Sequence, residues 1–177
     1  TIVTPYPALT GLLTEPAYPQ AAGLSLRNLN VTLFDRYKKC WSEVGEALFT
    51  HTGLSGPLAL TASSLMDAAR PKDYRIEIDL KPGLDSQALD RRILRDFSEA
   101  PNRDFGKSLG ALLPRSLCPI VVDLCGVPPQ RKVHEITREQ RGALCAVIKA
   151  FPLAVRGLGS FEEAVITRGG VCVREVD

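Results

Sequence analysis

A short run of small and hydroxyl-bearing residues is the part of this chain best suited to ligand binding. Residues 45–57 read GEALFTHTGLSGP, and the final proline stands where a helix can begin. Proline is tolerated in the first helical turn because the N–H that it lacks has no partner there. Gly53, Ser55 and Gly56 therefore bring backbone N–H groups to a helix N-terminus, which suits an anionic group or a closely approaching ligand. The alternative is a tight turn that needs glycines, with Ser55 as a cap, and the spacing alone favours it.

Two further groups of residues have side chains or backbone suited to contacting a ligand. His51 lies in the turn 50–53, where it can donate to a substrate, although a lone histidine beside a turn is more often structural. Near the other end of the chain, Thr167, Gly169 and Gly170 can present backbone N–H groups to a ligand. Their alternative is a hairpin turn in which the glycines supply positive φ.

Several catalytic and metal-binding patterns are missing from the sequence. It contains no G-x-S-x-G, no P-loop and no convincing pair of carboxylates. His51 and His134 are the only histidines, so we predict no metal site. The five cysteines are odd in number and include no C-x-x-C, which favours reduced core thiols in a cytoplasmic protein.

The composition is that of a globular domain with no strong electrostatic character. Hydrophobic residues make up 45% and charged residues 24% of the 177 residues, and the net charge is only +2. This charge argues against binding to nucleic acid or to an anionic membrane. There is no apolar run of transmembrane length and no signal-peptide pattern. The chain starts at Thr1 and stops within a strand-like run, as expected for a piece of a longer chain.

The elements that position these residues follow from the spacing of apolar side chains. A helix is predicted from Pro57, with apolar positions continuing to Ala69 and Pro71 as its end. Residues 73–80 alternate as a half-buried strand. Strands are also predicted over 37–50, 153–156, 162–166 and 171–176, with short extended pieces around residues 8–13 and loop elsewhere before residue 24. The phase shift within residues 24–33 indicates one strand with a bulge or two short strands.

After Gly83 the period changes from two to about three and a half residues, which predicts a block of four helices. The first carries Leu89, Ile93, Leu94 and Phe97 behind a cap at Asp85 or Ser86. A short one follows near 104–113, a third starts behind Ser116 and stops at Gly126, and a fourth begins with the capping box at Thr137. The chain is thus predicted to be an α+β protein. Residues 1–83 and 151–177 form a β-rich body, and residues 84–150 form an inserted all-helical subdomain.

The run GEALFTHTGLSGP resembles the signature of a family of bacterial FAD-dependent, NAD(P)-type oxidoreductases, the conserved or BaiN-like flavoproteins. Residues 163–171, EAVITRGGV, are similar to the T-x-G-G-V segment at which that family's chain returns to its flavin domain. The resemblance covers nearly all of this chain but only the middle of the family's protein. The dinucleotide-binding G-x-G-x-x-G that opens such proteins, and their closing Gly-rich segment, are absent here.

The resemblance implies a small β-barrel with a helical insertion that packs over the flavin of its own parent chain and shapes the cavity for a small organic substrate. FAD would be the cofactor and NAD(P)H the electron donor. The residues that it places at the cofactor are Thr50, His51, Gly53, Ser55, Gly56, Thr167, Gly169, Gly170 and Val171. The rival hypothesis is a non-enzymatic module whose helical insertion binds a protein or an RNA. The small net charge argues against RNA.

We predict that this chain by itself is colourless and oxidises neither NADH nor NADPH. A dinucleotide pyrophosphate needs a strand, a Gly-rich turn and a helix at the spacing of a Rossmann unit, and the turn before Pro57 lacks that spacing. Removal of the flavin domain is also expected to expose an apolar patch that includes Phe49, Leu54 and Val171. The absorption spectrum of the purified chain tests the prediction, and a stoichiometric flavin band would contradict it.

Overall fold

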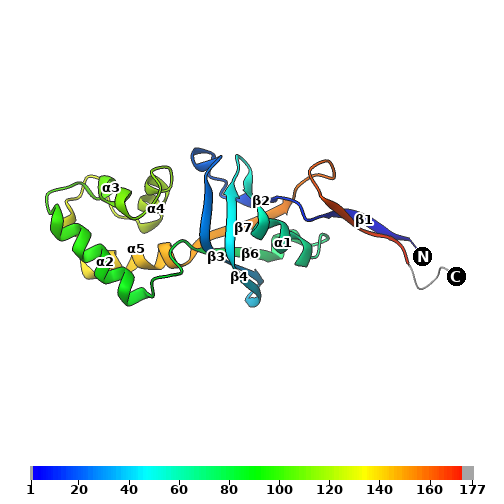
Figure 1. The fold of residues 1–177 in the computed structure, drawn as a ribbon, viewed down its shortest axis with the longest axis horizontal. Coiled ribbons are helices and arrows are strands. Elements are labelled where there is room, and N and C mark those ends of the chain that lie inside the picture. The colour runs from blue at the N-terminus through cyan, green and yellow to red at the C-terminus, as the bar shows by residue number, and fades with distance from the viewer. Residues whose placement is uncertain (1, 173–177) are drawn as a thin grey trace. The chain divides into compact units, whose positions relative to one another are not determined.

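A computed structural model describes residues 2–172 and divides the chain into two compact units. One unit contains Thr1–Arg27, Val31–Glu77 and Leu153–Asp177, and the other contains Asn28–Asn30 and Ile78–Pro152. Most strands and helix α1 belong to the first unit, and helices α2 to α5 belong to the second (Figure 1). The division of the chain at residues 84 and 150 stays a prediction. No described helix is long and apolar enough to cross a bilayer.

The β-strands form a small closed barrel, which confirms the predicted α+β fold class. Closure matters because it pairs the backbone groups that an open sheet would leave at its edges. Around the barrel the order is β2 (Leu12–Glu15), β5 (Gly53–Ser55), β4 (Lys38–Phe49), β3 (Ser25–Asp35), β6 (Tyr74–Asp79) and β7 (Phe151–Leu158).

Alternate residues of these strands fill the barrel core. Buried and half-exposed residues alternate strictly along β6, as predicted from its sequence. Strand β3 is continuous, with Asn28 at a φ of 57°, so the one-strand alternative is the correct one. The most deeply buried side chains of β3, β6 and β7 are Leu29, Val31, Leu33, Ile76, Ile78 and Phe151.

Helix α1 (Pro57–Leu65) starts at Pro57 as predicted but ends before the predicted limit at Pro71. Its N-cap is Gly56, at a φ of 85°, with no side-chain capping bond, so the interpretation of Ser55 as the cap is wrong. Two hydrogen bonds of Asp67 account for this early end. The Asp67 carboxylate accepts the Ala69 N–H at 3.0 Å, and the Asp67 N–H donates to the Tyr74 hydroxyl at 3.0 Å. These bonds replace the ones that a continuing helix would make.

The two ends of the described chain form a separate two-stranded ribbon. Strand β1 (Ile2–Ala8) pairs antiparallel with β8 (Ile166–Val171), from Ile2 opposite Val171 to Ala8 opposite Ile166. The predicted loop before residue 8 and the predicted strand at 162–166 are therefore wrong. Pro5 and Pro7 misled the prediction, because proline is tolerated in a strand that has a free edge. Most of the strand predicted at 171–176 lies outside the described residues.

The second unit contains all four predicted helices: α2 (Ser86–Glu99), α3 (Phe105–Ser108), α4 (Cys118–Cys125) and α5 (Arg138–Lys149). The Asp85 carboxylate caps α2 by accepting the Ala88 N–H at 2.7 Å, and both bonds of the capping box at Thr137 are present. Gly126 ends α4 in the left-handed conformation, as predicted. The cap of α4 is Leu117 rather than Ser116.

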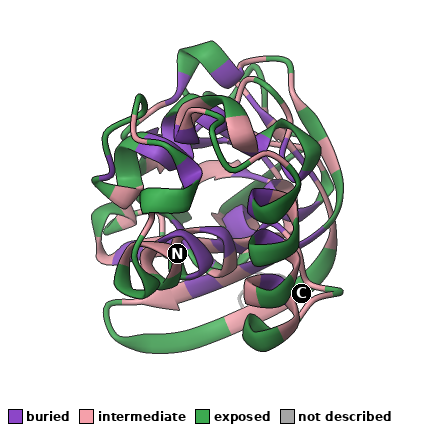
Figure 2. Ribbon diagram, turned by 90° about the vertical axis from the view of Figure 1, so that its left-hand side faces the viewer, coloured by how far each residue is buried: buried purple, intermediate pink, exposed green. Residues whose placement is uncertain are grey.

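These helices carry buried residues on one side and exposed residues on the other (Figure 2). Leu89, Ile93 and Phe97 of α2 are buried, but Leu94 is 43% exposed, which corrects its prediction as a core residue.

The predicted helix at 104–113 is split between α3 and a 3₁₀ turn. The four 3₁₀ turns among the described residues are Pro19–Ala21, Pro71–Asp73, Leu109–Ala111 and Val133–Glu135.

We predict that Gly53→Ala destabilises the chain by about 2 to 3 kcal/mol, because an added methyl overpacks a site with no room for it. An ideal Cβ at Gly53 would lie 2.1 Å from the Leu12 carbonyl oxygen, in the pairing of β2 with β5. The control is Gly83→Ala, since a Cβ there meets nothing within 4 Å; it should stay within about 0.5 kcal/mol. Chemical denaturation measures both, and equal stability of the two variants would contradict the close approach.

Candidate functional site

The turn at residues 50–53 is closed by its own hydrogen bonds. The Thr50 N–H donates to the Gly53 carbonyl at 2.9 Å, and the Gly53 N–H donates to Thr50 Oγ1 at 3.0 Å. The Gly53 N–H is therefore already engaged within the turn. His51 and Thr52 are exposed, and neither side chain has a partner among the described residues. Of this turn, these two side chains are the ones free to meet a ligand.

The glycines of the first stretch are used by the fold itself. Gly53 lies so close to the backbone of β2 that an ideal Cβ would stand 2.1 Å from the Leu12 carbonyl oxygen. Gly56 has a φ of 85°, and a Cβ there would lie 3.1 Å from the Leu48 backbone nitrogen. Both positions exclude side chains because of neighbouring backbone. Whether they also contact a cofactor stays a prediction.

A pocket of about 300 Å³ opens beside this turn within the barrel unit. Its polar lining consists of the hydroxyl-bearing Thr50, Thr52 and Ser55 together with the carboxylate of Glu163. Gly11 and Gly159 complete one wall, where the Gly159 N–H donates to the Gly11 carbonyl at 2.8 Å. Three hydroxyls and one carboxylate can donate and accept hydrogen bonds to a polar ring.

The wall of this pocket is anchored through Thr10 and Ser63, both buried. The Thr10 N–H donates to Ser63 Oγ at 3.0 Å, and Ser63 Oγ donates to the Leu60 carbonyl at 2.7 Å. This chain of bonds ties the segment between β1 and β2 to helix α1. The Thr10 hydroxyl itself is buried without a hydrogen-bond partner among the described residues, and it lies close to Gly159.

Thr167, Gly169, Gly170 and Val171 lie in β8, away from this pocket. Gly169 has a φ of 101° and approaches β1 closely, since a Cβ there would lie 2.7 Å from the Thr4 carbonyl oxygen. Gly170 faces open space, and Val171 is 63% exposed. Arg168 Nη1 donates to the Ser64 carbonyl at 2.8 Å, which places β8 beside the last turn of α1.

The turn that ends at Gly56 and strand β8 therefore lie at opposite ends of helix α1. Gly56 caps its first turn and Ser64 lies in its last, and at 1.5 Å per residue these positions are about 12 Å apart along the axis. Within this chain they do not close around one cavity. A ligand touching both would have to extend along the helix or lie against the surface that they share.

Sequence reasoning missed Thr10, Gly11 and Gly159 as neighbours of the first stretch. Nothing in their local sequence signals a site, because only the pairing of β2 with β5 and β7 brings them together. Glu163 is the first residue of the T-x-G-G-V-like segment 163–171, yet it lines the pocket beside the turn at residues 50–53.

The expected apolar patch is wrong at two of its three residues. Phe49 and Leu54 are 1% and 0% exposed, because they pair with one another across β4 and β5 and point into the barrel. Val171 is exposed as expected. Six of the twelve large apolar side chains exposed among the described residues lie instead on the ribbon or in the turn before it: Ile2, Val3, Phe161, Val165, Ile166 and Val171.

The thiols offer no nucleophile in the helical unit. Burial raises the pKa of Cys118 and Cys145, and it raises the pKa of Cys125 to about 12. These side chains therefore stay protonated at neutral pH, where the thiol is a poor nucleophile. All five cysteines are free thiols in the structure. Among residues 2–172 no cluster of three potential metal ligands occurs.

Comparison with known proteins adds a family and a relative. Residues 6–166 match the family described as the HI0933-like protein barrel and H2TH domain. The chain is also 28% identical over 129 residues to the ribosomal RNA dihydrouridine synthase of Escherichia coli strain K12. The match covers 73% of this chain and 30% of that protein, so the chain spans about a third of its relative's length.

We predict that Ser63→Ala destabilises the chain by about 2 kcal/mol, because it leaves the buried Thr10 N–H without its acceptor. Ser64→Ala is the matched control on the same helix. Its hydroxyl makes the same kind of bond to a carbonyl three residues back, at 2.7 Å, and within residues 2–172 it receives no bond from another segment. Ser64→Ala should change stability by less than about 0.5 kcal/mol in urea denaturation. Similar losses in both variants would show that the link to Thr10 adds nothing.

Proposed function

This chain belongs to the family of HI0933-like barrel and H2TH domains, and from that membership we propose that it is the insert domain of an FAD-dependent oxidoreductase. In the parent protein the barrel unit packs against the FAD-binding domain and borders the substrate cavity. The predicted cofactor residues lie in this unit, and its pocket has the hydroxyl groups that a polar ring can bond.

The single observation that carries this proposal is the β1–β8 ribbon. Two strands from opposite ends of the described chain leave the barrel side by side, as the two connections of an inserted domain to its host must do. The ribbon also exposes large apolar side chains, with Ile2 at 77% and Val171 at 63%. Such a patch normally marks a surface that another structure covers. The host's FAD-binding domain is the partner that the family supplies.

The residues present fit the edge of a flavin rather than the whole dinucleotide. The side chains of His51, Thr52 and Ser55 are available for hydrogen bonds, and Gly170 leaves open space for a ring to approach. The pyrophosphate needs a Rossmann turn that this chain lacks, so that part falls to the host domain. Bound there, FAD would supply two-electron redox chemistry, with NAD(P)H as the electron donor. This chain's residues would orient the ring and limit the access of water.

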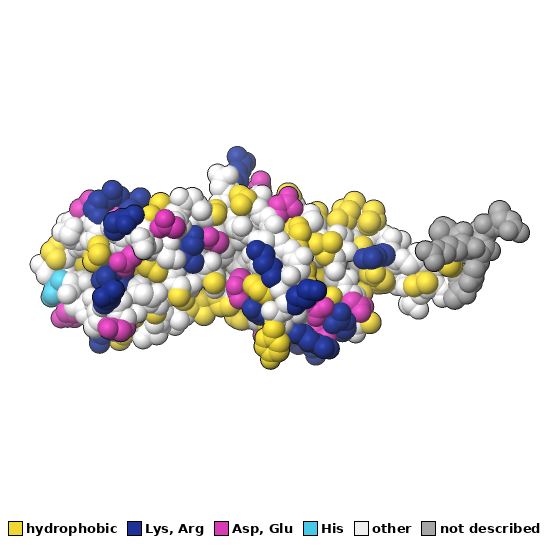
Figure 3. Space-filling view, turned by 90° about the horizontal axis from the view of Figure 1, so that it is seen from below, with side chains coloured by type: hydrophobic (Ala, Val, Ile, Leu, Met, Phe, Trp, Pro, Cys, Tyr) yellow, Lys and Arg dark blue, Asp and Glu magenta, His cyan; other side chains and the backbone are white. Residues whose placement is uncertain are grey.

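We propose further that the substrate of the parent protein is a uridine in RNA. The support is the relative named as a ribosomal RNA dihydrouridine synthase, which shares 28% identity across 73% of this chain. Conversion of uridine to dihydrouridine adds two electrons and two protons across one ring double bond, which is chemistry that a reduced flavin can supply. The small net charge is a weak counterargument, because it sums a surface on which both signs alternate (Figure 3).

The test uses the full-length parent protein. We expect it to be purified with stoichiometric FAD, to oxidise NAD(P)H, and to form dihydrouridine in unmodified ribosomal RNA, detected by mass spectrometry. The double variant Thr52→Ala, Ser55→Ala should lower flavin retention about tenfold, since each side chain is assigned a hydrogen bond to the ring. Thr61→Ala is the control, because that hydroxyl bonds its own helix at Pro57.

A parent protein without flavin would refute the oxidoreductase proposal and favour a non-enzymatic binding module. Flavin with NAD(P)H oxidation but no dihydrouridine would refute only the RNA substrate. Normal flavin retention in the double variant would remove Thr52 and Ser55 from the cofactor's contacts.

A further inference from the structure

The helical unit contains a groove of about 520 Å³ between α2 and α5. Residues from the first half of α2 line one side, and residues from most of α5 line the other. The polar and charged residues of the lining include Gln87, Asp90, Arg91, Arg138 and Arg141. The groove lies wholly within the second compact unit.

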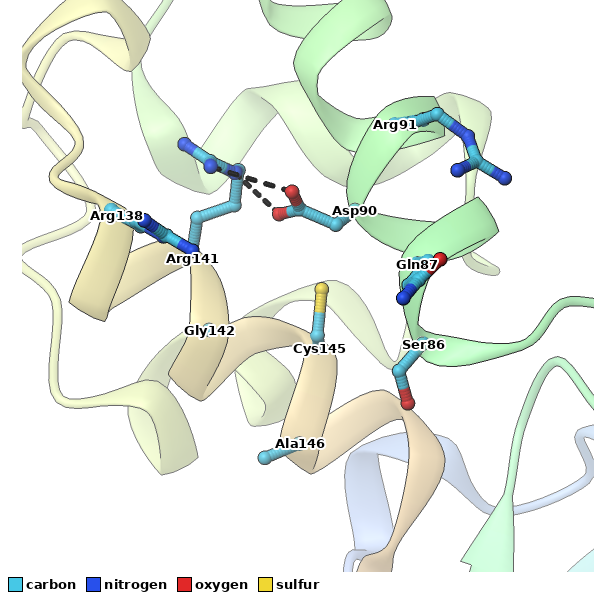
Figure 4. A pocket seen from close by; sticks show the side chains of 9 residues that line it. All are labelled: Ser86, Gln87, Asp90, Arg91, Arg138, Arg141, Gly142, Cys145 and Ala146. Atoms are coloured by element: carbon cyan, nitrogen blue, oxygen red, sulfur yellow. Dashed lines mark hydrogen bonds and ion pairs between the residues drawn. The ribbon is translucent and has the colours of Figure 1, made fainter.

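The charges in the groove do not balance. Arg141 of α5 forms an ion pair with Asp90 of α2, and the dashed lines in Figure 4 show this pair bridging the two helices. Arg91 and Arg138 have no carboxylate partner among the described residues, and in Figure 4 they stand on either side of the bridged pair. Within the groove lining, three guanidinium groups therefore face a single carboxylate, which is already paired with Arg141.

Other basic residues of the same unit do form ion pairs. Arg92 is paired with Asp96, Lys132 with Asp104, and Lys149 with Asp79. Glu139, the neighbour of Arg138, is exposed, and its pKa is lowered by hydrogen bonds to the Glu139 backbone and to Thr137 and then by the charge of Arg138. Glu139 does not line the groove, so it offsets the charge of Arg138 only from outside, and the lining keeps an excess of arginine.

A glycine keeps the groove open. Gly142 lies in the interior of α5, where glycine is disfavoured relative to alanine, and a Cβ there would meet nothing within 4 Å. Packing therefore does not require the glycine. It lines the groove between Arg138 and Cys145, so its missing side chain lets a ligand approach the helix backbone.

We propose that the groove between α2 and α5 binds the phosphate backbone of the RNA substrate, an inference that rests on the proposed function. Separated arginines suit a chain of phosphates better than a single small anion, since each guanidinium can make two parallel bonds to one phosphate. Gln87 and Ser86 add groups able to bond ribose hydroxyls, which distinguish RNA from DNA. Arg91 and Arg138 hold adjacent phosphates, and Arg141 fixes the helices between them.

The test measures RNA binding by the full-length flavoprotein, with a labelled 20-nucleotide uridine-containing RNA as the probe. The double variant Arg91→Gln, Arg138→Gln should weaken binding about tenfold. It should also reduce the slope of log K against log salt by about 1.4, the value for two lost contacts to single-stranded RNA. Arg103→Gln, Arg115→Gln is the matched control. It removes the same charge from two exposed arginines of the same unit, outside the groove, and should bind almost as tightly as the unmodified protein.

A second variant tests the shape of the groove at constant charge. Gly142→Leu should weaken binding several-fold and leave the salt slope unchanged, because it fills the groove without removing a phosphate contact. Flavin content and NAD(P)H oxidation should be unaltered in every variant, which verifies folding. If both double variants lose binding equally, the attraction is diffuse and the groove proposal fails. Unchanged binding in the groove variants also overturns it, while the RNA substrate stands. No binding by the unmodified protein refutes the RNA substrate as well.

Discussion

The barrel closes through one very short strand, and the arrangement of the candidate site depends on that closure. Strand β2 has four residues, yet it pairs with β5 on one side and with β7 on the other. Its Leu12 carbonyl lies where any side chain at Gly53 would stand. Six strands can enclose a core without free edges only if this strand is held on both sides. The close backbone contact at Gly53 therefore links the need for glycine at this position to closure of the barrel and to the pocket beside it.

The pocket follows from this closure. Its hydroxyl groups come from the turn before β5 and from the end of β5 itself, and its carboxylate comes from the segment after β7. Strand β2 lies between the two and holds both. The bonds from Thr10 through Ser63 to Leu60 then fix helix α1 against the same strand's start. Strands β2 and β5 beside this pocket belong to a closed ring of backbone hydrogen bonds, which holds them against small shifts.

Local sequence predicted the helical unit better than the barrel. Caps at Asp85, Thr137 and Gly126 act within a few residues, so they can be read from sequence without knowing the fold. The β1–β8 ribbon is not predictable from local sequence, because the prolines of β1 indicate a loop. Whether a strand tolerates proline depends on which of its edges is paired, and the partner strand decides that. The early end of α1 depends on Tyr74, which lies beyond the turn. Phe49 was misplaced because orientation within a barrel depends on strand register.

The same distinction applies to the candidate sites. The spacing was enough to select the glycines and hydroxyl-bearing residues of 50–56 as candidates. It could not show which of them are used in packing and which are free to contact a ligand. The groove of the second unit has no sequence motif. Arg138 and Arg141 belong to one helix and Arg91 to another, fifty positions apart, and only the antiparallel packing of α2 against α5 collects them (Figure 4). A net charge of +2 conceals such a cluster, because it counts charges without their positions.

The ribbon has a further consequence for how a host protein would fold. For a host chain that carries this domain as an insert, the unfolded domain is a very long loop between two host segments. Closing a loop of this length costs about 4 to 5 kcal/mol in chain entropy. Pairing of Ile2 with Val171 brings the two junctions together within the domain itself. The domain's own folding thus shortens the host's loop to almost nothing, so the insert is expected to fold first and to act as the nucleus that draws the two halves of its host together.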